Sequence, residues 1–256
     1  MSRAADSAGQ PWQGRHFESN ANADDDGSAP PAYLAVVSAL RAGQCSMVEV
    51  VDVVRSCRFL IPLVAIAGET GLNDDGHRVD KTQELSIITV TGPDGRPILP
   101  VFSSVASMSN WRADARPVPA DSVRVALAAA SEHTDRVVID AGSPDSLVVL
   151  PRPAVWAIAQ REPWLPAIND PEVLQAIARP VAQHPEIWAV SLLAGDPLAT
   201  GEAAEVIVRL AVEPGVSPER LRAVTDSLSA QWAQDATVAE RIDSLSVHLV
   251  AASSGN

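Results

Sequence analysis

This sequence has almost no lysine, although it has many acidic residues. Lys81 is the single lysine among 19 basic residues, and the formal net charge is −13. Binding to a nucleic-acid backbone or to an anionic membrane surface needs clustered basic residues. The arginines are instead scattered along the chain, a bias that we attribute to a GC-rich bacterial genome. The charge therefore predicts neither a nucleic acid nor a membrane as partner.

Cysteines and long apolar runs are also scarce. Cys45 and Cys57 are the two cysteines, and a disulfide framework or a four-ligand zinc site would need more ligands. The longest apolar run, residues 59–67, is far shorter than the roughly 20 residues of a membrane helix. Residues 1–20 contain no apolar signal segment. We therefore expect a cytoplasmic protein with two reduced thiols.

The signatures of common catalytic and cofactor sites are missing. The sequence has no G-x-G-x-x-G, no phosphate loop ending in G-K-S/T, no G-x-S-x-G and no H-E-x-x-H. Its histidines are widely separated, which predicts structural roles and no metal site. They are His16, His77, His133, His184 and His248. We expect no cofactor and no metal, and the sequence favours a protein that is not an enzyme.

Composition divides the chain into a tail and two modules. Residues 1–29 are polar and acidic, which predicts a disordered tail. Residues 30–162 and residues 171–256 each combine helical and strand patterns, and the second module has the order α-β-β-α-β. A linker with Trp164 and several prolines joins them. The predicted fold class is α+β, with two modules that each pack helices on a small mixed or antiparallel sheet.

Capping and turn residues predict the local structure of the first module. Ser46 and Glu49 have the spacing of a capping box at the start of a helix. A β-hairpin is expected from residues 85–90 and 98–102, because the turn G-P-D-G lies between these two apolar segments.

Further elements follow from proline, glycine and apolar periodicity. The sequence R-P-V-P at residues 116–119 predicts a loop. Residues 136–140 and 147–150 predict a second hairpin around a Gly-Ser-Pro-Asp turn. In the second module, we expect a helix at residues 217–234 and a last strand at residues 242–250.

Aromatic residues supply the candidate binding residues. Tryptophan is enriched at binding hot spots, although most large aromatic side chains pack in cores. Trp164 is flanked by prolines and is expected to be partly exposed. We take Trp111, Trp164 and Phe102 as the candidate binding residues and expect the other tryptophans to lie in cores.

Two segments of the first module resemble the N-terminal domain of the SseB family. They are F-L-I-P-L-V at residues 59–64 and G-R-P-I-L-P-V-F-S-S at residues 95–104, followed by Trp111. Family members are similar in having a strand with Val/Ile-Pro, the motif G-x-x-x-L-P-V-F-T-S and a following tryptophan; here Ser103 replaces the commoner threonine. The resemblance extends over residues 33–160, and residues 171–256 look more distantly like the family's C-terminal domain. It implies a role assisting a rhodanese-type sulfurtransferase and supplies no catalytic residue.

Two functional hypotheses remain open. The first is a non-catalytic protein-binding or adaptor protein that engages an unidentified protein through a sheet edge or its proline-rich loops. The second is an accessory factor or enzyme in thiol or sulfur transfer, with Cys57 as the candidate nucleophile. A reactive thiolate needs a cation or a helix N-terminus beside it, and Arg55 and Arg58 are its neighbours in sequence. The oligomeric state does not follow from the sequence.

Overall fold

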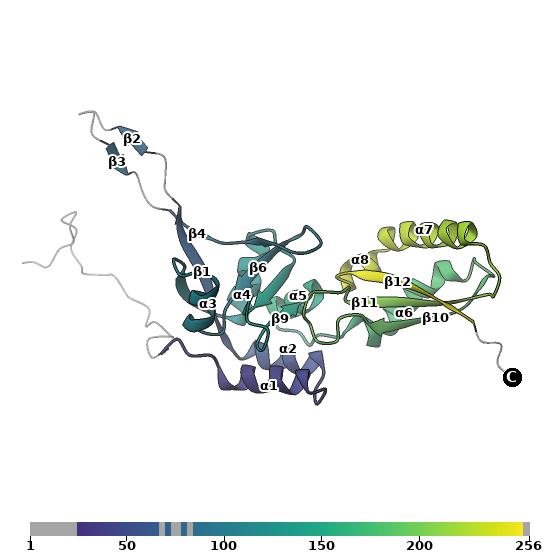
Figure 1. The fold of residues 1–256 in the computed structure, drawn as a ribbon, viewed down its shortest axis with the longest axis horizontal. Helices are drawn as coiled ribbons and strands as arrows, with labels where there is room; N and C mark the ends of the chain where they lie inside the picture. Colours follow the sequence, from purple (N-terminus) through teal and green to yellow (C-terminus); the bar gives the residue numbers. More distant parts are fainter. Residues whose placement is uncertain (1–24, 67–69, 73–77, 81–83, 253–256) are drawn as a thin grey trace, which may run out of the picture.

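The computed structural model describes residues 25–66, 70–72, 78–80 and 84–252, which form two modules joined end to end (Figure 1). Most of the predicted tail, together with His16 and His77, lies outside the described residues. The last residues before the first module lie against it. The guanidinium of Arg58 contacts the carboxylate of Asp25 and donates to the carbonyl oxygen of Ser28 at 2.9 Å.

Two helices open the first module. Helix α1 (Pro31–Arg41) has a proline in its first turn, where the fixed φ of proline suits a helix. Helix α2 (Met47–Arg55) follows Ser46, whose amide donates to the Glu49 carboxylate at 2.7 Å. The predicted capping box is therefore confirmed. Both helices contribute buried side chains to the core of the module; they are Tyr33, Val37 and Leu40 of α1 and Val50, Val51 and Val54 of α2.

A first antiparallel sheet has the order β4-β1-β7. Its strands are β1 (Arg58–Ile66), β4 (Glu84–Ile87) and β7 (Arg116–Asp121). The loop predicted at residues 116–119 is wrong, because this segment pairs with β1, with Pro117 opposite Pro62 and Pro119 opposite Leu60. A proline can occupy a strand at the end of a sheet, where its missing N–H breaks no ladder on the outer side.

A second sheet has the order β5-β6-β8-β9. Its strands are β5 (Val90–Thr91), β6 (Pro97–Val101), β8 (Arg136–Ile139) and β9 (Val148–Leu150). The predicted first hairpin is confirmed only at its turn, where Val90 pairs with Ile98; residues 85–87 pair with β1 instead. The second hairpin is confirmed by the antiparallel pairing of β8 with β9. The two sheets are joined where Leu60 and Phe102 exchange backbone hydrogen bonds of 2.7 and 2.9 Å.

Three helices and one small β-ribbon complete the first module. The helices are α3 (Val105–Trp111), α4 (Ser122–Ser131) and α5 (Arg152–Gln160), and the ribbon pairs β2 (Thr70–Leu72) with β3 (Arg78–Asp80). Asp121 caps α4 by accepting a hydrogen bond from the Arg124 amide at 2.9 Å. Helices α4 and α5 pack together, and α4 covers both sheets at β1, β6 and β8. The main core of the module lies beneath them.

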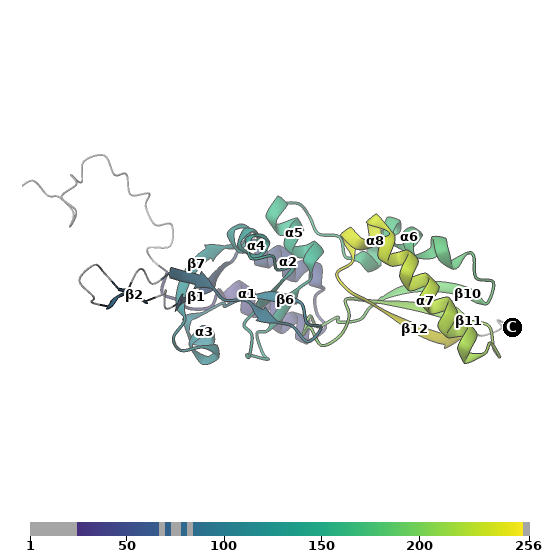
Figure 2. The same cartoon turned by 90° about the horizontal axis from the view of Figure 1, so that it is seen from above.

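The second module has the predicted order with two additions. Its elements are η1 (Ala167–Asn169), α6 (Pro171–Val181), β10 (Ile187–Ala194), β11 (Val206–Val212), α7 (Pro218–Gln234), α8 (Ala236–Arg241) and β12 (Leu245–Ala251). Strand β11 pairs antiparallel with β10 and parallel with β12, and α6, α7 and α8 lie on one face of the sheet (Figure 2). The last strand begins later than predicted, because Asp235 caps α8 through the amides of Thr237 and Val238.

Each module has its own hydrophobic core between its helices and its sheets, and the predicted α+β class is confirmed. In the second module, the Trp232 side chain is buried as expected, and its indole N–H donates to the carbonyl oxygen of Ile177 at 3.0 Å. The same expectation is wrong for Trp156 and Trp188, whose side chains are exposed.

In the first module, Trp164 from the linker and Ala199 from the second module join the core cluster. The modules therefore share packed surface as well as a linker. Within the described residues, no helix is long and apolar enough to cross a membrane.

Candidate functional site

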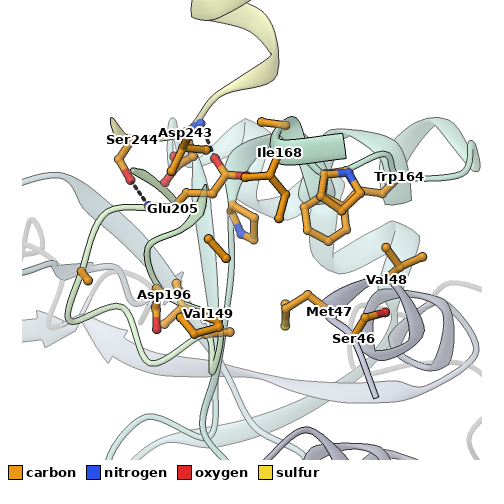
Figure 3. A pocket seen from close by; sticks show the side chains of 18 of the residues that line it. Ser46, Met47, Val48, Val149, Trp164, Ile168, Asp196, Glu205, Asp243 and Ser244 are labelled. Atoms are coloured by element: carbon orange, nitrogen blue, oxygen red, sulfur yellow. Dashed lines mark hydrogen bonds between the residues drawn. The ribbon is translucent and has the colours of Figure 1, made fainter. Parts of the chain in front are cut away.

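A pocket of about 330 Å³ lies between the two modules (Figure 3). Its walls come from the start of α2, strand β9, the linker before α6, and two segments of the second module: the loop between β10 and β11 and the segment between α8 and β12. Most of the lining side chains are apolar, with a few polar groups among them. A concave, mostly apolar cavity with a few polar groups at a junction between domains is the usual form of a ligand site. We take this pocket as the candidate functional site.

The loop between β10 and β11 fixes one wall of the pocket to the first module. The Val149 amide donates to the Ala199 carbonyl oxygen at 2.8 Å. Ala199 and Gly201 have positive φ values of 52° and 76°, and a Cβ on Gly201 would approach Val149 to 2.9 Å. Asp196 holds this conformation by accepting hydrogen bonds from the amides of Thr200 and Gly201, at 3.0 and 2.6 Å. The Asp196 carboxylate is therefore occupied within its own loop.

An ion-pair network closes the pocket beside β8. The Arg136 guanidinium donates to Asp243 at 2.5 Å and to Asp94 at 2.8 Å. Arg96 also contacts both carboxylates, at 3.2 Å from Asp243 and 2.8 Å from Asp94. The side chains of Arg136 and Asp243 are only 9% and 3% exposed. Buried charges of this kind persist only when they are paired, so the network connects the first module to the segment before β12.

Glu205 places a carboxyl group with a raised pKa in the pocket. Its Oε2 accepts a hydrogen bond from the Asp243 amide at 2.7 Å, and its own amide donates to the Ser244 hydroxyl oxygen at 3.0 Å. Burial raises the pKa of Glu205 to about 7, and the neighbouring charge of Asp243 adds to the rise. Among the described residues, none donates a hydrogen bond to Oε1 of Glu205. This oxygen is thus one acceptor that the pocket offers to a ligand.

Trp164 forms the opposite, apolar wall with Met47 and Val48 (Figure 3). The sequence led us to expect a partly exposed tryptophan, and that expectation is wrong, because Trp164 is only 8% exposed. Its ring packs against the core of the first module, which covers most of its surface. Its buried indole N–H has no acceptor within the described part of the chain. A buried donor without a partner costs free energy, so this N–H is a destabilising feature of the linker.

The other two aromatic candidates lie away from the pocket. Phe102 is fully buried, so it cannot contact a partner, and its choice as a binding residue is corrected. It packs on Trp111 with ring centroids 5.1 Å apart. Trp111 is half-buried against a small cluster that contains Phe102 and is separate from the main core. Next to them, Ser103 donates from its amide and its hydroxyl to the buried Asp140, at 2.7 and 2.6 Å. This segment therefore stabilises the end of β6, a role that the motif alone did not reveal.

The structure places Cys57 in the core of the first module. Its side chain is 6% exposed, and burial raises the pKa of its thiol, although Arg58 acts in the opposite direction. The Arg58 guanidinium contacts the Asp25 carboxylate and donates to the Ser103 carbonyl oxygen. Arg55 donates to the Ala157 carbonyl oxygen. Both neighbouring cations are thus engaged elsewhere. Cys45 lines the pocket, but burial raises the pKa of its thiol as well.

We expect the Cys57 thiol to react about 100-fold more slowly with a disulfide reagent in the native protein than in urea. The thiolate is the reactive form, and burial disfavours both its formation and its contact with the reagent. The measurement uses a Cys45→Ser variant, so that Cys57 is the reporting thiol, and follows release of the coloured thiolate. A native rate close to that of the unfolded chain would restore Cys57 as a candidate nucleophile.

The residues that build the pocket are mostly those that sequence reasoning missed. Trp164 is the exception, since it was named as a candidate from its proline-flanked position. Glu205, Asp243 and Arg136 are part of no recognisable motif, and their partners lie up to 147 positions away along the chain. Within the described ranges, no group of three or more His, Cys, Asp or Glu residues could hold a metal ion. No sequence signal could have indicated that Glu205, Asp243 and Arg136 lie close together.

Comparison with known proteins gives one match. The family model of the SseB protein N-terminal domain matches residues 33–157, which begin within α1, end within α5 and include both sheets of the first module. Searches of the curated proteins and of the solved structures each found no match. The looser likeness of the second module to the family's C-terminal domain stays a prediction. The matched region contains the two segments whose resemblance the sequence displayed, and residues 33–157 belong to the family of SseB protein N-terminal domains.

Proposed function

We propose that this chain is a non-catalytic binding protein that holds a segment of another protein in the pocket between its modules. The observation that carries the proposal is the apolar pocket itself, which both modules and the linker build together. The proline-rich linker was expected to engage a partner, and Trp164 and Pro166 of this linker line the pocket. The expected compartment is the cytoplasm, in which the two free cysteines would stay reduced.

The apolar wall formed by Trp164, Met47 and Val48 supports a peptide as the occupant. A peptide offers apolar side chains of the size that Met47 and Val48 would contact. Thiol or sulfur transfer by Cys57 ranks below this proposal, because the thiol is buried and its pKa is raised.

A random peptide library displayed on phage tests the proposal. We expect the full chain to enrich a family of related peptides, and a Val48→Trp variant to lose that enrichment because the indole fills the pocket. The matched control is Val123→Trp: Val123 is also the second residue of its helix and half-buried, yet it does not line the pocket. Enriched peptides that bind Val48→Trp as well as they bind the natural protein would contradict the proposal, and so would the absence of any enrichment.

A further inference from the structure

The pocket has an acidic side and an apolar side. Figure 3 shows Glu205 and Asp243 on one side, with Trp164, Met47 and Val48 across from them. Three carboxylates line the pocket against one guanidinium; they are Asp196, Glu205, Asp243 and Arg136. The lining therefore carries excess negative charge, in a chain whose net charge is −13.

Of these carboxylates, Glu205 is the one available to a ligand. Asp196 is occupied by the amides of its own loop, and Asp243 is paired with Arg136 and Arg96. Glu205 uses only Oε2, leaving Oε1 without a donor from the described residues. The other charges near it are Asp243, Arg136 and Arg152, and the Arg152 guanidinium donates to the Ile242 carbonyl oxygen at 2.5 Å.

We infer that the partner segment presents a basic side chain, lysine or arginine, whose apolar stem lies along Trp164 and Met47 and whose cation meets Glu205. This inference rests on the proposed function and names the chemistry of the bound segment. Lysine and arginine combine an apolar stem with a charged end, which is the pattern of the two sides of the pocket. A cation beside a partly desolvated carboxylate forms a stronger pair than it does in water.

The same reasoning makes recognition depend on the protonation of Glu205. A neutral Glu205 offers no charge to a cation, so binding of a basic ligand should strengthen as the pH rises through the range in which this carboxyl ionises. The charged groups that face it are Asp243, Arg136 and Arg152, and Asp196 lies farther along the same lining. The guanidiniums stay charged throughout this range, so they do not set the pH dependence.

A matched series of small ligands tests the inference on the full chain. The ligands are hexylammonium, hexanol and hexanoate, which share a stem and differ in charge. We expect hexylammonium to bind about tenfold more tightly than hexanol, with hexanoate the weakest. The readout is the indole N–H signal of Trp164 in NMR titrations, assigned with a Trp164→Phe variant. In Glu205→Gln the preference for the cation should vanish, whereas in Glu202→Gln, an exposed neighbour that does not line the pocket, it should persist.

The outcomes separate this inference from the proposed function. Equal binding of hexylammonium and hexanol to the natural protein overturns the inference, as does a preference that survives in Glu205→Gln, or no binding of hexylammonium at all. Peptides enriched by the natural protein should also carry Lys or Arg at one fixed position. Peptide enrichment that depends on Val48 but shows no fixed Lys or Arg would support the proposed function. It would contradict the inference that a basic side chain is bound.

Discussion

Replacing Arg136 by alanine should lower the free energy of unfolding by about 3 kcal/mol. The change removes the closest cation from Asp243, whose side chain is only 3% exposed. Arg96 would remain 3.2 Å from Asp243, but this carboxylate would then have one guanidinium beside it in place of two. Breaking a buried ion pair leaves a charge that neither water nor protein compensates, and this penalty outweighs the value of the pair itself.

Urea denaturation followed by tryptophan fluorescence and circular dichroism measures this loss. Arg124→Ala is the control, because Arg124 is 75% exposed and lies 3.6 Å from Asp121, so its removal should be nearly neutral. Adding Asp243→Asn to an Arg136→Met change should recover a large part of the stability, since the buried charge is removed with its partner. An Arg136→Ala variant no less stable than Arg124→Ala would show that the network contributes nothing.

The second large effect is a pH dependence of stability that Glu205 carries. The folded pKa of Glu205 is about 7, against an ordinary value of 4.5, so the native state holds this proton more tightly than the unfolded chain does. Between these two values, the native state binds more protons, and stability therefore falls as the pH rises. A difference of this size corresponds to about 3 kcal/mol of stability, which is fully lost above the folded pKa.

Glu205→Gln should remove this dependence, because glutamine cannot ionise yet can still accept the hydrogen bond from the Asp243 amide. Burial also raises the pKa of Asp243, which acts in the same direction. The relevant measurement is therefore the difference in unfolding free energy between variant and natural protein, across urea titrations from about pH 4 to pH 8. This difference should grow with pH in Glu205→Gln and stay flat in Glu202→Gln. A flat difference for Glu205→Gln would mean that its carboxyl titrates normally.

Local sequence signals predicted those elements whose stability comes from neighbouring residues. The capping box at Ser46, the hairpin of β8 and β9, and the order of the second module all follow from caps, turns and apolar spacing. The errors occur where a distant strand decided the outcome. Residues 116–119 became a strand because β1 pairs with them, and residues 85–87 pair with β1 instead of extending the hairpin.

The aromatic candidates show the same division. Sequence position singled out Trp164, but its burial followed from the core of the first module, which lies outside the linker. Phe102 was another aromatic candidate, and the structure encloses it completely. Exposure depends on everything that packs around a side chain, and most of those neighbours are remote in sequence.

The sequence by itself determined the fold class, the capped helices, the turns and the family, because each depends on residues a few positions apart. Only the tertiary structure decided which side chains line the pocket. Of the three candidate binding residues, it placed Trp164 of the linker there and left Trp111 and Phe102 outside. Arg136 meets Asp243 across 107 positions, and the raised pKa of Glu205 arises from burial between modules. Electrostatic energies depend on separation in space and on exclusion of water, and neither is recorded in the order of the residues.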